Sequence, residues 1–222
     1  MASNRKLRIL CLHGYRQDAD IFRSKMGGFR KSIKNIAELV FISAPHVVPE
    51  SENVADSPST RGCSWWFCEE TKTFHSKVEC RFAKGFEDSI AVIKSTFDTQ
   101  GPFDGILGFS QGASLVSLIC GLKENKEFTH EFHFAVIVAG FRSVCQSHAY
   151  LYKKLLKMPS LHIIGESDTC IPKELNEGLM ITFLEPSAIY HEGGHFIPSN
   201  SSVRRQYVSF FKRMYDSLVN KN

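Results

Sequence analysis

One stretch of the sequence decides the fold: Phe103-Asp104-Gly105-Ile106-Leu107-Gly108-Phe109-Ser110-Gln111-Gly112-Ala113. Its first half is a short apolar run typical of a buried strand, and Gln111 begins a segment of helical periodicity. Ser110 therefore lies in a tight turn, where Gly108 and Gly112 have no side chains to clash. Serine also commonly caps helices, which is the alternative interpretation. A Gly-x-Ser-x-Gly pattern in this strand-turn-helix setting predicts the nucleophile elbow of an α/β-hydrolase fold.

The rest of the chain has the pattern of a mostly parallel sheet with helices on both faces. Short apolar runs predict strands at 7–12, 39–42, 105–109, 134–139, 161–164 and 188–191. Helical periodicity predicts helices at 21–36, 82–97, 111–122 and 203–218. In the second helix, Phe82, Phe86, Ile90 and Ile93 should share one face. We expect a single domain over residues 1–222, with an irregular insertion at about 45–73.

Composition excludes several classes of protein. The 222 residues carry a net charge of +4 from scattered basic residues, which argues against a nucleic-acid partner. No apolar stretch approaches the roughly 20 residues of a transmembrane helix, so we expect a soluble protein with no membrane span. Seven cysteines, an odd number, favour free thiols in a reducing compartment, the cytoplasm or the nucleus. Cys63 and Cys68 lack a second ligand pair, so neither a metal nor another cofactor is expected. The sequence does not determine the oligomeric state.

A serine nucleophile needs a histidine base and a carboxylate that orients it, and in this fold they follow the serine in the order acid, then histidine. His195 is the best base because it lies in a glycine-flanked loop after the last expected strand. Five other histidines lack that context: His130, His133, His148, His162 and His191. Asp168, in the loop after the strand at 161–164, is the best acid, and Glu166 is the runner-up.

Two backbone N–H groups should stabilise the oxyanion that forms on the substrate carbonyl. The residue after the nucleophile, Gln111, should supply one of them. A loop after an early strand should supply the other, and we assign it to Tyr15, in His13-Gly14-Tyr15-Arg16-Gln17. We expect His13 to fix this loop rather than to act in catalysis.

Several segments together resemble the fungal-type serine hydrolase family. They are Leu10-Cys11-Leu12-His13-Gly14-Tyr15-Arg16-Gln17, Arg61-Gly62-Cys63-Ser64-Trp65-Trp66-Phe67, the stretch around Ser110 at 101–113, Pro159-Ser160-Leu161-His162 and Gly193-Gly194-His195-Phe196-Ile197-Pro198. The resemblance spans nearly the whole chain. It implies carboxylic-ester hydrolysis by a triad that maps onto Ser110, Asp168 and His195. Some relatives carry Phe where this chain has Tyr15, which affects the shape of the pocket more than the backbone donor.

The aromatic cluster Trp65-Trp66-Phe67 has two interpretations of equal weight. It forms either an apolar wall that binds a medium or long acyl or alkyl chain of a small-molecule ester, or part of the core. An acyl-thioesterase or acyl-peptide hydrolase is the alternative within enzymes, because the same triad attacks other acyl carbons. A non-catalytic binding protein on the same fold is the alternative outside them.

Overall fold

A six-stranded parallel sheet organises the structure, a computed structural model that describes residues 5–49, 62–68 and 73–219. The strands lie in the order β10-β9-β8-β7-β1-β2. Their bounds are β1 Leu7–Leu12, β2 Ala37–Ile42, β7 Gly105–Phe109, β8 Phe134–Val138, β9 Ser160–Gly165 and β10 Pro186–His191. The central strands β1, β7, β8 and β9 are almost wholly buried because helices cover both faces of the sheet.

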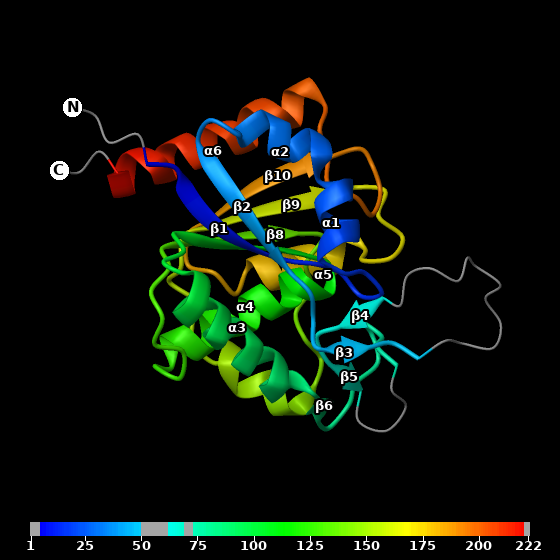
Figure 1. Ribbon diagram of the computed structural model, residues 1–222. Coiled ribbons are helices and arrows are strands. Elements are labelled where there is room, and N and C mark those ends of the chain that lie inside the picture. The colour runs from blue at the N-terminus through cyan, green and yellow to red at the C-terminus, as the bar shows by residue number, and fades with distance from the viewer. Residues whose placement is uncertain (1–4, 50–61, 69–72, 220–222) are drawn as a thin grey trace.

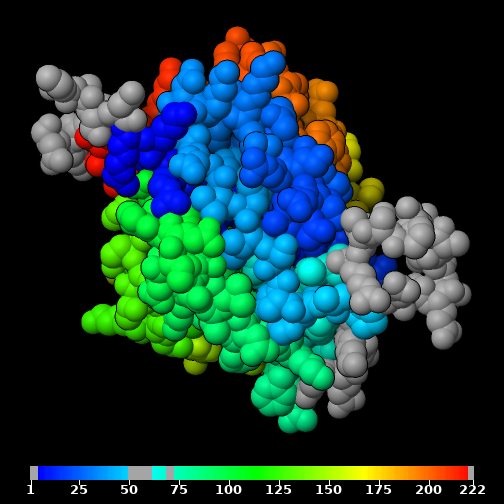
Figure 2. Space-filling model, in the orientation of Figure 1, coloured from blue at the N-terminus to red at the C-terminus, as the bar shows by residue number. Residues whose placement is uncertain are grey.

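The helices form two layers, one on each face of the sheet (Figure 1). One layer consists of α1 Ala19–Lys25, α2 Gly27–Ile33 and α6 Ser201–Val219. The other consists of α3 Phe86–Gln100, α4 Gln111–Glu124 and α5 Lys173–Met180, together with the 3-10 helix η1 at Gln146–Tyr152. Each layer buries its own apolar cluster against the sheet. In the space-filling view, the N-terminal segments (blue) lie above the residues of the middle of the chain (green) on one face (Figure 2).

The direction in which strands are added reverses between β1 and β7. From β1 the chain moves outward to β2, and later strands add on the other side of β1 in the order β7, β8, β9 and β10. The chain therefore leads from β1 to α1 in one helix layer and from β7 to α4 in the other, and open α/β sheets bind ligands at the carboxyl ends of the strands at such a point. Ser110 and the loop that begins at His13 follow these two strands.

The expected α/β architecture and its parallel sheet are confirmed, but two expected helices have wrong bounds. The segment predicted as one helix at 21–36 forms α1 and α2, which meet at Met26. Gly27 and Gly28 follow, and glycine has a low helix propensity. The helix predicted to begin at Phe82 begins at Phe86, and Phe82 is 57% exposed instead of sharing the buried face. Gly85, with φ of 85°, ends the extended segment there.

Part of the expected insertion at 45–73 lies outside the described residues, namely 50–61 and 69–72. The described part takes part in two small antiparallel sheets, which the sequence did not predict. They pair β3 His46–Val47 with β4 Cys63–Ser64, and β5 Phe67–Cys68 with β6 Ala83–Lys84. Within the ranges that the structure describes, no helix is both long and apolar enough to cross a membrane.

Candidate active site

Ser110 occupies the sharp turn between β7 and α4. Its φ of 53° and ψ of −117° put the backbone in a region that non-glycine residues rarely adopt, at a cost of roughly 1–3 kcal/mol. Two backbone hydrogen bonds fix it there: the Ser110 N–H donates to Val138 O at 2.9 Å, and Ser114 N–H donates to Ser110 O at 3.0 Å. The turn leaves Ser110 8% exposed, so the hydroxyl is held at the edge of the buried core.

Three glycines let the chain close around Ser110. A Cβ on Gly108 would overlap the Gly112 carbonyl, and one on Gly112 would overlap the carbonyl oxygens of Leu12 and His13. A Cβ on Gly14 would lie 3.3 Å from the Cβ of Ser110, so the loop after β1 runs directly beside the serine. The elbow, the first turn of α4 and this loop are therefore in backbone contact, as the motif predicts.

His13 holds the loop after β1 in place. Its Nε2 accepts the Ala44 N–H at 2.9 Å, which leaves the proton on Nδ1 to donate to Gly14 O at 2.7 Å. Burial lowers the pKa of His13 below its usual value, so the ring stays neutral in this arrangement. The Gln17 side chain also accepts the Gly14 N–H at 3.2 Å. The loop that carries Tyr15 is thus fixed before any substrate binds.

The side chain of Gln111 has a role that the sequence analysis missed. It is fully buried, with Oε1 accepting the Trp65 N–H at 3.0 Å and Nε2 donating to Trp66 O at 2.8 Å. Ser64 Oγ lies 3.2 Å from both atoms of the same amide. The indole N–H of Trp65 donates to His13 O at 2.8 Å. Gln111 and Trp65 therefore fasten the segment at 64–66 to the start of α4 and to the loop after β1.

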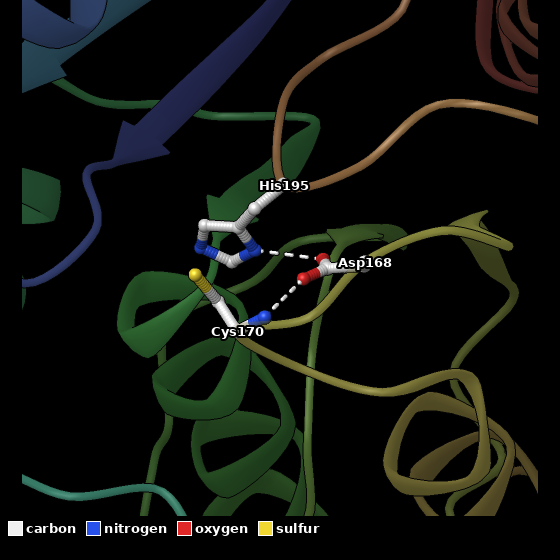
Figure 3. Close-up of side chains that lie close together, drawn as sticks. All are labelled: Asp168, Cys170 and His195. Atoms are coloured by element: carbon white, nitrogen blue, oxygen red, sulfur yellow. Dashed lines mark hydrogen bonds and ion pairs between the residues drawn. The ribbon is translucent and has the colours of Figure 1, made fainter.

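Asp168 and His195 meet across the ends of β9 and β10 (Figure 3). The Asp168 side chain is fully buried, and its Oδ2 accepts the Nδ1–H of His195 at 2.7 Å. Its Oδ1 accepts the backbone N–H groups of Cys170 at 2.9 Å and Ile171 at 2.8 Å. A carboxylate only accepts hydrogen bonds, so the ring proton lies on Nδ1, which leaves the Nε2 of His195 free to take a proton.

The imidazole of His195 packs on Phe109, the residue before Ser110, with ring centroids 4.7 Å apart. This contact brings the histidine next to the elbow. Among the hydrogen bonds of the described residues, none joins the Ser110 hydroxyl to His195. Such bonds often tighten only when substrate binds.

The other candidates lie in settings that suit structural roles. Glu166, the runner-up acid, is exposed, and its backbone N–H donates to His191 O at 2.8 Å. His162 is buried within β9, 3.2 Å from Ser160 Oγ. His148 is buried beside Phe86, with ring centroids 4.3 Å apart.

The aromatic cluster is mostly core. Trp65 is 0% and Trp66 2% exposed, and Phe67 is buried in β5. Trp66 also lines a recess that the sequence analysis did not identify, whose other apolar walls include Phe74 and Phe141. Phe141 comes shortly after the carboxyl end of β8. Ligand-binding residues of open α/β sheets follow the carboxyl ends of strands, so this position in the sequence could have indicated Phe141.

Residues 1–207 match the family described as Serine hydrolase (FSH1). The chain belongs to this serine hydrolase family. It is 44% identical to Esterase OVCA2 of Danio rerio over 93% of this chain and 97% of the relative. It is 37% identical to Esterase C25G4.2 of Caenorhabditis elegans over 100% of both chains. This serine hydrolase is therefore an enzyme.

Solved structures confirm the α/β-hydrolase fold of this serine hydrolase. Acyl-protein thioesterase 2 of Zea mays superposes with a TM-score of 0.66, at 13% identity over 96% of this chain and 95% of that one. Arabidopsis thaliana SOBER1 gives a TM-score of 0.62 at 17% identity, over 95% of this chain and 99% of that one. At these identities the likeness concerns the fold alone.

Proposed function

We propose that this serine hydrolase cleaves small-molecule carboxylic esters through Ser110, His195 and Asp168. The observation that carries the proposal is the buried Asp168, which orients His195 at 2.7 Å and leaves its Nε2 free beside the elbow. The names of relatives such as Esterase OVCA2 support an ester as the substrate. A non-catalytic role is disfavoured because a binding protein has no need of this oriented pair.

The reaction would pass through an acyl-enzyme. The Ser110 oxygen attacks the ester carbonyl carbon while His195 Nε2 takes the hydroxyl proton. The resulting oxyanion accepts hydrogen bonds from the N–H groups of Tyr15 and Gln111. Gln111 begins α4, and the first N–H groups of a helix have no partner inside it. His195 then gives its proton to the departing alcohol. A water molecule, activated by the same histidine, releases the carboxylic acid and restores Ser110.

Substitutions of Asp168 and of Glu166, which lie in the same loop after β9, test which carboxylate is the acid of the triad. Asp168→Asn should lower kcat by roughly 10³–10⁴-fold, because the amide cannot hold the His195 tautomer that has a free Nε2. Glu166→Gln should leave kcat within about twofold, because the Glu166 side chain is exposed to solvent. Both are measured with a chromogenic ester. Equal losses in the two variants, or no loss in Asp168→Asn, would contradict the proposed triad.

We further propose that the recess binds the acyl chain. Aromatic rings connect it to the oxyanion loop: Phe74 lies 5.4 Å from Tyr15, 5.4 Å from Trp66 and 5.8 Å from Phe141, between ring centroids. The aromatic rings that line the recess suit a hydrocarbon chain, and we propose a medium or long acyl chain as its occupant.

Filling the recess tests this assignment. Val144 lines it and is 37% exposed, so Val144→Trp adds bulk without disturbing the core. The kcat/KM ratio of p-nitrophenyl octanoate to p-nitrophenyl acetate should fall by about tenfold or more, since each displaced methylene loses apolar contact. Leu184→Trp, at a position 53% exposed that does not line the recess, is the matched control. An unchanged ratio in Val144→Trp would exclude the recess as the acyl site.

A further inference from the structure

A thiol lies beside the Asp168–His195 pair and has no part in the proposed hydrolysis. Cys170 is exposed, and the hydrogen bond from its backbone N–H to Asp168 fixes where its side chain begins. In Figure 3 the sulfur points toward the imidazole, on the side of the ring nitrogen that does not contact Asp168. One ligand atom each from Asp168, Cys170 and His195 lie within 4.8 Å of one another.

The donor set suits zinc. A thiolate binds Zn²⁺ at about 2.3 Å and an imidazole nitrogen at about 2.0–2.1 Å, which puts the two atoms about 3.6 Å apart in a tetrahedral site. Cys170 is exposed, so its side chain is free to change rotamer when a metal ion binds. Histidines that bind zinc commonly donate their other ring N–H to a carboxylate, and His195 already donates Nδ1–H to Asp168.

We propose that Cys170 Sγ and His195 Nε2 together bind a zinc ion, with Asp168 orienting the imidazole, and that zinc thereby inhibits the enzyme. The inhibition, though not the binding, rests on the proposed function. Cys170 releases its thiol proton to solvent on binding, and water completes the coordination. No electron is transferred. The lone pair of Nε2 that would accept the Ser110 proton is donated to the metal instead, so zinc and nucleophile activation exclude each other.

Other thiols of the chain are poorly placed for this chemistry. Cys11 and Cys120 are buried, and burial raises the pKa of the Cys11 thiol well above its usual value. Cys63 and Cys68 are half-buried, and neither belongs to a ligand cluster among the described residues. Among the cysteines, all of which lie in the described ranges, Cys170 is the exposed one.

Inhibition is the first readout. The rate of ester hydrolysis is measured over a range of buffered free Zn²⁺ concentrations, with a phosphine present to keep the thiols reduced. The rate of each protein is divided by its own rate without zinc, so that differences in basal activity cancel. We expect micromolar inhibition of the wild type and a rise of at least about tenfold in the inhibitory concentration for Cys170→Ser. Cys63→Ser is the matched control and should remain as sensitive as the wild type. Equal sensitivity of the wild type and Cys170→Ser would overturn the proposal.

A direct measurement of metal binding tests the zinc site independently of ester hydrolysis. Ser110→Ala protein, in which the proposed nucleophile is absent, is titrated with Co²⁺ as a spectroscopic substitute for zinc. A thiolate-to-cobalt absorption should appear in Ser110→Ala and be absent from Ser110→Ala/Cys170→Ser. Absence of the band from both would overturn the metal site and leave the esterase proposal standing. A Cys170-dependent band without inhibition of the wild type would refute the inhibitory role and count against His195 as the base.

Discussion

Ser110 has a backbone conformation that few serines adopt, and its neighbours make that conformation possible. With φ at 53°, the residue turns the chain from β7 into α4 within one step. Gly108 and Gly112 provide the space, because backbone atoms of α4 and of the loop after β1 occupy the positions where their side chains would be. A Cβ on Gly14 would lie 3.0–3.4 Å from side-chain atoms of Phe109 and Ser110. The conformation of the proposed nucleophile therefore depends on glycine at these positions.

Two glycine-to-alanine substitutions test this dependence. Gly112→Ala should lower the free energy of unfolding by at least about 1–3 kcal/mol and reduce ester hydrolysis, because its Cβ meets backbone carbonyls. Gly178→Ala, in α5, meets no atom within 4 Å and should raise stability by about 0.5–1 kcal/mol through helix propensity. Urea denaturation measures both. The steric account fails if Gly112→Ala is as stable as Gly178→Ala.

Several residues of the candidate site follow from sequence order alone, and others do not. Motif and order predict Ser110, His195 and the loop that holds the acid, because the fold fixes which loops meet. The order of residues along the chain does not distinguish Asp168 from Glu166, since both lie in one loop. Their burial does, because Asp168 is buried and Glu166 is exposed. The Gln111 side chain escapes sequence reasoning because its partners, at 64–66, are more than 40 residues away in the chain.

At the scale of elements, apolar periodicity finds buried segments more reliably than their bounds. The strands at 7–12 and 105–109 are found with the predicted limits. Phe82 matches the spacing of the buried face of α3, yet it lies before Gly85, whose left-handed backbone separates it from the helix. Hydrophobic spacing carries no information about backbone handedness, so the predicted helix began four residues too early.

The aromatic segment at 65–67 contributes both to the core and to the candidate site. Trp65 joins the loop after β1 to the start of α4, and Trp66 packs in the core while one side lines the recess. Composition alone favours neither the core nor a substrate wall, because large aromatic rings supply apolar area to both. The hydrogen bonds of Trp65 are what assign it to the framework of the site.

At the scale of the whole molecule, stability should depend on two buried histidines that are not part of the proposed triad. Burial lowers the pKa of His148 to about 4 and that of His162 to about 3. Below pH 6.5 the unfolded chain takes up these protons while the folded chain does not, so stability is lost as the pH falls. The loss approaches about 1.4 kcal/mol per pH unit for each group, until its folded pKa is reached.

Urea denaturation at pH 7 and pH 5 measures this effect. The double variant His148→Gln/His162→Gln should lose up to about 4 kcal/mol less stability than the wild type over that interval, even though its stability at pH 7 is lower. His133→Gln, at an exposed position, should follow the wild type. A pH dependence in the double variant equal to that of the wild type would show that other groups cause the acid sensitivity.

The central claim, that Ser110 is the nucleophile, is tested most directly by covalent labelling. A fluorophosphonate probe should add one adduct to the wild type, located by peptide mapping on Ser110, and none to Ser110→Ala. Ser114→Ala is the matched control and should label like the wild type. Ser114 is buried on the same helix, and its hydroxyl has no hydrogen-bond partner among the described residues. Equal labelling of Ser110→Ala and wild type, or an adduct on another serine, would contradict the mechanism.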